Sequence, residues 1–324
     1  MPVESDWREA RLRSVADIAD DIRLFDIEPG GWFEPPPPGS HISVAVRIGE
    51  RPDTRSYSVV GPCRDSVYRI AVKRMPQSRG GSAYLWSLAP GARLSITPPR
   101  NLFPLAHGRP QYLLVAGGIG ITPIYSMALA LAEKGADFRL LYGCRSRGDL
   151  AFADELRERI GDRLEIAVEE EGQRPDLPGA VAALAPDGEL YVCGPIGLLD
   201  AVRRLWRDSG RPAANLRFET FGNTGRFAAE PFTVRIPRLG LEVQVPQNRT
   251  MLDALEAAGV AMISDCRRGE CGLCTVKVLD VDGALDHRDV FFSDRQKDEG
   301  KRMCTCVSRA VQGGITIDTA DRSA

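Results

Sequence analysis

The stretch "SDCRRGECGLCTVKVLD" (residues 264–280) places three cysteines, Cys266, Cys271 and Cys274, within nine residues. Further on, "MCTCVSRA" (303–310) adds two more. Thiolates of this kind can ligate zinc or an iron–sulfur cluster, and in an oxidising compartment they form disulfides. The choice between a zinc site, an iron–sulfur cluster and disulfides decides how the C-terminal third of the chain folds.

The spacing C-x4-C-x2-C followed by a distant cysteine is typical of a plant-type [2Fe–2S] site. Gly269 and Gly272 suit such a loop, because glycine permits positive φ and lets backbone N–H groups approach the sulfurs. Arg267 and Arg268 would offset the negative charge of a cluster. The fourth thiolate is either Cys304 or Cys306, and the spacing alone does not choose between them, since residues two apart on a strand share a face.

Other metal sites fit the pattern less well. Structural zinc usually takes two C-x2-C-like pairs, and this sequence has one pair plus isolated cysteines. A Rieske centre needs two histidines within its motif, and the three histidines of the chain, His41, His107 and His287, are not paired with a cysteine motif. The cysteine pattern therefore favours a plant-type cluster.

Composition sets the broad class. Hydrophobic content of 43% and charged content of 27% are those of a soluble globular protein, and 324 residues predict two or three domains. The first residues are acidic where a signal peptide would be basic and then apolar, so we expect a cytoplasmic protein with reduced thiols. No apolar run is long enough for a membrane span, and a net charge of −2 gives no basic field for nucleic acid.

The first hundred residues contain short extended runs, "HISVAVRI", "RSYSVV", "VYRIAVKR" and "RLSITPP", separated by turns rich in glycine and proline. This spacing predicts a small antiparallel β-barrel or sandwich, as residues 1–104. From there the pattern changes to buried strands alternating with helices, ending at "LRFETF". That alternation predicts an α/β domain with a parallel sheet, as residues 105–223.

Residues 224–230 are small and polar and are expected to form a linker. After it, "FTVRIP" and "LEVQVP" indicate a hairpin, and "TMLDALEAAGV" indicates a short helix that begins at Thr250. The cysteine loop follows, so residues 231–324 are predicted to form an α+β domain around the cluster.

Together the motifs "RSYSVV", "SRGGS", "AGGIGITPI", "YVCGP", "FETFG" and "DHRDVFFSD…CVSRA", in this order, resemble the phthalate dioxygenase reductase family, which includes vanillate O-demethylase reductases. The resemblance covers almost the whole chain. It implies an FMN-binding barrel, an NADH-binding domain and a C-terminal β-grasp ferredoxin domain. In that family the fourth cluster ligand directly precedes V-S-R-A, which implies Cys306 and leaves Cys304 a packing role.

The resemblance also implies a flavin site on the barrel. Arg55, Ser56, Tyr57 and Ser58 would grip the flavin, and Val72 and Lys73 would line it. The run Arg79, Gly80, Gly81 and Ser82 precedes a predicted helix, so its backbone N–H groups and a guanidinium could face one phosphate. Taken alone, the first run could be an edge strand and the second an ordinary turn before a helix.

"LLVAGGIGITPI" predicts a strand that runs into a nucleotide-binding turn. Its glycines would let a pyrophosphate approach the backbone, and "CGP" would end a second strand at the same edge of the sheet. The resemblance places Cys193 near the nicotinamide, and Phe221 with Glu219 where the nicotinamide meets the flavin. Cys193 could instead be an ordinary buried cysteine, and Phe221 an aromatic side chain that only packs at the end of the domain. The predicted nucleotide-binding residues are Gly117, Gly118, Gly120, Thr122, Pro123, Arg145, Gly194 and Pro195.

Arg145 and Arg147 leave the choice of nucleotide open on the residues alone, because they could clamp the 2′-phosphate of NADPH or be solvated loop charges. The resemblance favours NADH. It implies a reductase that takes hydride from NADH onto FMN and passes single electrons through the cluster to a Rieske-type aromatic ring-hydroxylating or O-demethylating oxygenase. We expect a monomer with a transient partner interface. The alternatives are an FAD-containing relative that serves another monooxygenase, and a non-catalytic zinc or redox-sensing protein.

Overall fold

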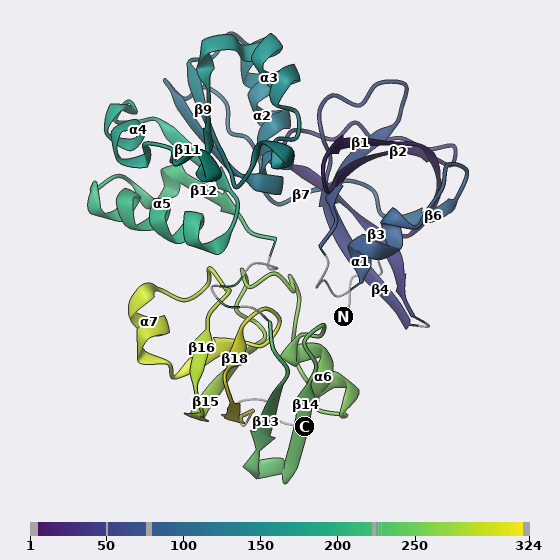
Figure 1. Cartoon of the computed structure of the whole chain (residues 1–324), viewed down its shortest axis with the longest axis vertical. Coiled ribbons are helices and arrows are strands. Elements are labelled where there is room, and N and C mark those ends of the chain that lie inside the picture. Colours follow the sequence, from purple (N-terminus) through teal and green to yellow (C-terminus); the bar gives the residue numbers. More distant parts are fainter. Residues whose placement is uncertain are drawn as a thin grey trace. The chain divides into compact units, whose positions relative to one another are not determined.

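The computed structural model describes residues 6–49, 51–75, 80–221, 225, 227 and 229–319. These residues divide into two compact units, Met1–Gly194 with Leu198–Glu219, and Pro195–Gly197 with Thr220–Ala324. The first unit contains an antiparallel sheet and a parallel sheet, and the second contains the cysteine loop (Figure 1). No helix in the described ranges has both the length and the apolar character to cross a membrane.

The antiparallel sheet of the first unit closes into a barrel. Its strands follow the order β4-β3-β6-β1-β2-β5, and an isolated antiparallel bridge between Val59 and Ile70 joins the two ends. Alternate residues of these strands point inward, and Leu12, Ile27, Ile42 and Val44 are among the fully buried core residues. The elements are β1 (Arg8–Ala19), β2 (Ile22–Pro29), β3 (Ser40–Ile48), β4 (Arg51–Ser58), β5 (Tyr68–Lys73), α1 (Gly81–Trp86), β6 (Arg93–Ile96) and β7 (Arg100–Asn101).

The parallel sheet has the order β10-β9-β8-β11-β12, so the direction of winding reverses between β8 and β11. Figure 1 shows α2 and α3 on one side of this sheet and α4 and α5 on the other. The central strands β8 and β11 are buried along their whole length, as expected for strands covered on both faces. The elements are β8 (Tyr112–Gly117), α2 (Ile121–Glu133), β9 (Phe138–Cys144), α3 (Ala153–Ile160), β10 (Leu164–Val168), α4 (Leu177–Ala183), β11 (Glu189–Cys193), α5 (Ile196–Asp208) and β12 (Leu216–Glu219).

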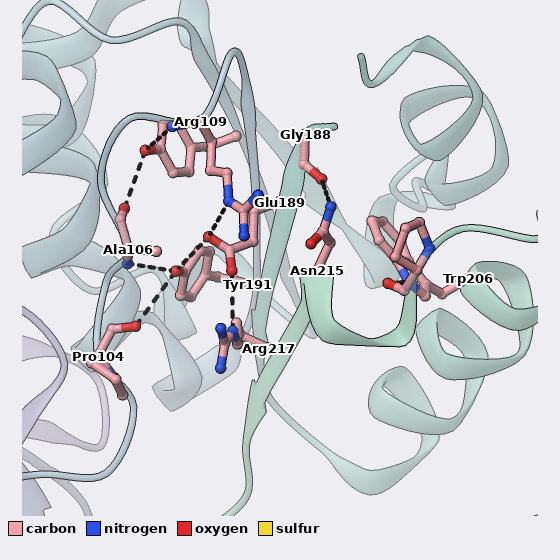
Figure 2. A network of polar contacts seen from close by, with 11 residues as sticks. Pro104, Ala106, Arg109, Gly188, Glu189, Tyr191, Trp206, Asn215 and Arg217 are labelled. Atoms are coloured by element: carbon pink, nitrogen blue, oxygen red, sulfur yellow. Dashed lines mark hydrogen bonds and ion pairs between the residues drawn. The ribbon is translucent and has the colours of Figure 1, made fainter. Parts of the chain in front are cut away.

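A buried polar network ties the segment between the barrel and the parallel sheet to the start of β11. The carboxylate of Glu189 is completely buried, and it accepts hydrogen bonds from the Tyr191 hydroxyl at 2.9 Å and from Arg217 Nε at 3.0 Å (Figure 2). The same hydroxyl accepts the Ala106 N–H at 2.7 Å. Because each buried polar group finds a partner, the connecting segment is held in a defined position.

The second unit is an α+β fold with a five-stranded mixed sheet of order β14-β13-β19-β15-β17 and a two-stranded sheet of β16 and β18. Helix α6 begins as predicted, with Thr250 capping the helix through the N–H of Asp253. The elements are β13 (Phe232–Ile236), β14 (Leu241–Val245), α6 (Met251–Ala257), β15 (Thr275–Val281), β16 (Ala284–Asp286), α7 (Asp294–Glu299), β17 (Arg302–Cys304), β18 (Arg309–Val311) and β19 (Gly314–Asp318).

These observations confirm the predicted fold class of antiparallel barrel, parallel α/β sheet and α+β C-terminal domain. They also add two long strands, β1 and β2, that the sequence patterns did not identify. The domain boundaries at 104/105 and 223/224 and the linker at 224–230 stay predictions.

Candidate functional site

A cradle on the barrel is formed by Arg55 of β4 and the start of α1. The Arg55 guanidinium pairs with Asp53 at 2.8 Å and donates to the Thr54 carbonyl at 2.7 Å. Its second terminal nitrogen, Nη2, is buried and has no hydrogen-bond partner within the described residues. A Cβ at Gly81 would lie 2.7 Å from Arg55 Cγ, so only glycine fits there. An unsatisfied buried donor beside such a backbone fits the phosphate of FMN.

The neighbouring residues of this predicted flavin site differ in how they are placed. Gly80 has φ of 96°, a left-handed conformation that favours glycine. Tyr57 is half-buried against the barrel core and Ser58 is buried, whereas Ser56 is exposed. Ser82 Oγ accepts the Met75 N–H at 3.4 Å. Arg79 lies outside the described residues.

Val72 and Lys73 end β5. The Val72 side chain is buried in the barrel core, and its carbonyl accepts the Trp86 indole N–H at 3.0 Å. Lys73 Nζ pairs with Asp149 at 2.5 Å and with Asp21 at 3.4 Å. Burial acts to raise the pKa of Asp149, but the ion pair with Lys73 and hydrogen bonds from Ser146 lower it overall. Lys73 therefore joins the barrel to the parallel-sheet part of the first unit.

The predicted nucleotide turn lies where the winding of the parallel sheet reverses. Gly117 ends β8, Gly118 has φ of 52°, and the backbone of Gly120 packs directly against the Cys193 carbonyl, leaving no room for a Cβ. Gly194 also lies close to Gly117, with 3.1 Å between the position of a Cβ on Gly194 and Gly117 Cα. The turn therefore lies at the carboxyl edge of the sheet, next to the reversal of winding, which is where open α/β sheets bind ligands.

Other predicted nucleotide residues surround that turn. The Thr122 hydroxyl donates to the Ile119 carbonyl at 3.0 Å, so it stabilises the turn itself, and Pro123 is buried in the first turn of α2. Pro195 is exposed just before α5. Arg145 is exposed, and its carbonyl accepts the Glu170 N–H at 3.0 Å.

Cys193 and Glu219 are paired neighbours at the ends of β11 and β12. Both side chains are buried, with 0% and 3% exposed. Phe221 follows two residues later, is half-buried, and belongs to the second compact unit. The sheet register thus brings together two of the three residues predicted to lie at the nicotinamide.

The cysteine loop of the second unit is built around the sulfur of Cys266. It accepts the backbone N–H groups of Arg268, Glu270 and Cys271, each at 3.4 Å. Burial raises the pKa of the Cys266 thiol, and these N–H groups oppose the shift. Both predicted loop glycines adopt positive φ, 78° at Gly269 and 72° at Gly272. A loop that directs N–H groups at sulfur fits an iron–sulfur cluster.

The two arginines of this loop are each paired with carboxylates. Arg267 contacts Asp253 at 3.1 Å and Glu256 at 2.9 Å, both on α6, and Arg268 contacts Glu270 at 3.2 Å. Their charges are therefore largely balanced within the protein, which weakens the predicted role of offsetting the charge of a cluster.

Cys274, Cys304 and Cys306 are buried together on the other side of the loop. Hydrogen bonds with Cys304 and Cys306 lower the pKa of the Cys274 thiol to about 3, and the same bonds raise the pKa values of its two partners. Cys306 also interacts with the Gly269 N–H and with Cys266, whereas the further neighbour of Cys304 is Asp289. These neighbours favour Cys306 over Cys304 as the fourth ligand, and the assignment stays a prediction.

No group of three His, Cys, Asp or Glu side chains in the described ranges is arranged around a single metal-ion position. A [2Fe–2S] cluster does not require one, because four thiolates are shared between two irons. The four cysteines come from one loop and one distant segment, as the spacing predicted.

Asp289 is a site residue to which the sequence analysis gave no role. Its carboxylate is completely buried and accepts the Ser308 hydroxyl at 3.1 Å and the Phe292 N–H at 3.0 Å. The next residue, Val290, donates its N–H to the Gly269 carbonyl at 3.0 Å. Asp289 therefore connects the cysteine loop to the segment that carries Cys306. In the sequence, only its position within the motif "DHRDVFFSD" could have indicated a role for Asp289 near the cysteine loop.

Comparison with known proteins agrees with this geometry. Residues 114–204 match the oxidoreductase NAD-binding domain, and residues 234–311 match the 2Fe-2S iron-sulfur cluster binding domain. The chain is 37% identical to phthalate dioxygenase reductase of Burkholderia cepacia over 98% of this chain and 99% of the relative. It is 38% identical to phenoxybenzoate dioxygenase subunit beta of Ectopseudomonas oleovorans over 95% and 96%.

A solved structure of phthalate dioxygenase reductase, described as modular for electron transfer from pyridine nucleotides to [2Fe-2S], superposes with a TM-score of 0.72 at 35% identity. The superposition covers 97% of this chain and 98% of that one. These matches confirm the resemblance and the predicted cofactors, FMN, NADH and a [2Fe–2S] cluster, while the individual contact residues stay predictions. The chain belongs to the phthalate dioxygenase reductase family and is an NADH-dependent flavin and iron–sulfur oxidoreductase.

Proposed function

We propose that this chain is the reductase component of an aromatic ring-hydroxylating or O-demethylating oxygenase system. The observation that carries the proposal is that one chain combines a close-packed glycine turn at the edge of a parallel sheet, a buried unsatisfied arginine donor on a barrel, and a loop of cysteines packed near further buried cysteines. Relatives that match this chain over nearly their whole length are named phthalate dioxygenase reductase and phenoxybenzoate dioxygenase subunit beta.

Each part of the chain has a task that its residues can perform. The turn at Gly117–Gly120 accommodates the pyrophosphate of NADH, because its backbone can be approached closely. Cys193 and Glu219, at the ends of adjacent strands, limit the space beside the nicotinamide. Arg55 binds the phosphate that anchors the flavin.

Bound flavin and cluster supply the conversion of one hydride into two single-electron transfers. The chain holds the four thiolates of Cys266, Cys271, Cys274 and Cys306. Backbone N–H groups at Cys266 stabilise negative charge on that sulfur. No acid–base pair is needed for this chemistry.

For the partner we propose a Rieske-type oxygenase that docks transiently at the face beside the cysteine loop. Leu273 and Phe291 are 46% and 47% exposed next to that loop, and the Phe291 ring lies against Gly272. Charges in residues 231–324 nearly balance, so the interface should depend only modestly on salt. We further propose a monomeric protein in the cytoplasm, where thiols that ligate a cluster stay reduced.

Flavin identity tests the proposal against its nearest alternative, an FAD-containing reductase with the same C-terminal domain. Acid releases the flavin from the purified protein, and chromatography then distinguishes FMN from FAD. The proposal requires FMN together with iron and acid-labile sulfide. Recovery of FAD would favour the alternative, and a colourless protein that binds only zinc would overturn both.

A further inference from the structure

The loops after β9 and β10 leave the parallel sheet side by side. In the register of these strands Cys144 lies opposite Val168, the last residue of each strand. Beyond them the chain forms two short 3₁₀ turns, Arg147–Asp149 and Glu169–Glu171, and the Glu170 N–H donates to the Arg145 carbonyl at 3.0 Å. Gly117 of the nucleotide turn lies opposite Gly143 of β9, so both loops belong to the nucleotide-binding edge.

Arg147 and Glu171 form a two-point ion pair across these loops. The Arg147 Nε contacts Glu171 Oε1 at 2.5 Å, and its Nη2 contacts Oε2 at 2.9 Å. Gln173 also positions this carboxylate. Its side-chain Nε2 donates to Glu171 Oε2 at 3.4 Å, and its Oε1 accepts the Val168 N–H at 3.1 Å. The fork of the guanidinium is therefore occupied by a carboxylate of the same chain.

In a βαβ nucleotide-binding unit, the residues just beyond the second strand lie at the adenosine ribose. An acidic side chain there accepts the 2′-hydroxyl of NADH, whereas an arginine accommodates the 2′-phosphate of NADPH. β9 is the second strand of the unit β8-α2-β9. Arg145 and Arg147 would suit a 2′-phosphate. However, Arg147 is already paired with Glu171, whose carboxylate adds a negative charge at this position.

We propose that Glu171 is the residue that makes this protein reject a 2′-phosphorylated nucleotide. It does so by holding Arg147 in the ion pair and by repelling the phosphate. The inference rests on the proposed use of NADH at this edge and adds the group that discriminates. It follows that Arg147 could bind a 2′-phosphate once its ion pair with Glu171 is removed.

The test is nucleotide-fragment binding to the flavin- and cluster-loaded protein, measured by calorimetry at low ionic strength. The probes are 5′-AMP and 2′,5′-ADP, which differ only by the 2′-phosphate. Glu171→Gln should tighten 2′,5′-ADP binding by about tenfold, because it removes the negative charge of Glu171 and frees the Arg147 guanidinium near the protein surface. It should change 5′-AMP binding little.

Two further variants make the result specific. Arg147→Ala combined with Glu171→Gln should lose most of the gain. Glu169→Gln is the matched control, because it removes an equal charge from the same turn, where Glu169 contacts Arg174 only at 3.9 Å. It should leave the preference near that of the unmodified protein. Glu171→Ser repeats the measurement with a shorter side chain should the glutamine variant be poorly folded.

An unchanged ratio of the two affinities in both Glu171 variants would overturn the inference, and so would an equal gain in Glu169→Gln or a gain that survives the loss of Arg147. These outcomes differ from failure of the proposed function. In that case the unmodified protein would bind neither 5′-AMP nor NADH, whereas the inference fails in a protein that still binds both.

Discussion

The Arg55 side chain lies directly against the backbone of Gly81, with 2.8 Å between Arg55 Nε and the position that a Cβ on Gly81 would occupy. This relationship joins the middle of β4 to the start of α1. It leaves Arg55 Nη2 buried and unsatisfied among the described residues. A buried donor of this kind has a free-energy cost unless a ligand satisfies it, so we expect an anionic group to bind here.

Replacing Arg55 should therefore release the flavin. We expect Arg55→Ala to weaken FMN binding by about tenfold or more, because a charge-assisted hydrogen bond contributes about 1.5–3 kcal/mol. The measurement is the flavin-to-protein ratio after gel filtration, together with iron content. Arg47→Ala, an exposed arginine on β3, is the control and should keep its flavin. Full flavin occupancy in Arg55→Ala would show that the cradle has another role.

The assignment of the fourth cluster ligand gives a paired prediction. Cys306 interacts with the Gly269 N–H and with Cys266, whereas Cys304 is buried behind Cys274. Cys306→Ser should lose most iron and acid-labile sulfide, and Cys304→Ser should retain both with some loss of stability. The visible absorbance of the two purified variants tests this. The reverse outcome would assign the ligand to Cys304.

Because Gly120 lies so close to the Cys193 carbonyl, we expect the addition of a single methyl group at Gly120 to weaken nucleotide binding. Gly120→Ala would force the two segments apart, because a Cβ would overlap the carbonyl. The dissociation constant for NADH should rise by about tenfold or more, with flavin and cluster contents unchanged. Gly197→Ala adds the same methyl group where no atom lies within 4 Å, and it should bind NADH normally. Normal binding by Gly120→Ala would remove this turn from the nucleotide site.

The Lys73–Asp149 ion pair predicts a pH-dependent stability. The pKa of Asp149 is lowered in the folded protein, so its contribution is present above the unfolded pKa of about 3.9 and is lost as pH falls through the lower folded value. Asp149→Asn should lower the melting temperature at pH 7 and have a smaller effect at pH 3. Asp154→Asn, whose side chain is 99% exposed, is the control. An equal effect of Asp149→Asn at both pH values would contradict the ion-pair account.

Local patterns were enough to predict the parallel sheet and the cysteine loop, but not the start of the barrel. β1 carries charged residues and two shifts of register, after Leu12 and after Asp17, which break the alternation that marks a strand. The strand is stabilised instead by pairing with β2, the next strand along the chain, and with β6, which is distant in sequence. Tertiary pairing of this kind leaves no local signal.

Side-chain partners were the other part that sequence could not supply. Lys73 was expected at the flavin, and its pairing with Asp149 joins residues 76 positions apart. The loop arginine Arg267 likewise pairs with two carboxylates on α6, Asp253 and Glu256. Residue type limits which partners are possible, but the fold decides which of them are near.

The central claim, that electrons pass from NADH through a flavin to a [2Fe–2S] cluster in this one chain, is tested most directly by an anaerobic titration with NADH. Optical spectra follow the flavin, and electron paramagnetic resonance follows the cluster. The account predicts bleaching of flavin absorbance and a reduced [2Fe–2S] signal that approaches one spin per protein. A loaded protein in which NADH bleaches the flavin but no reduced-cluster signal develops would contradict it.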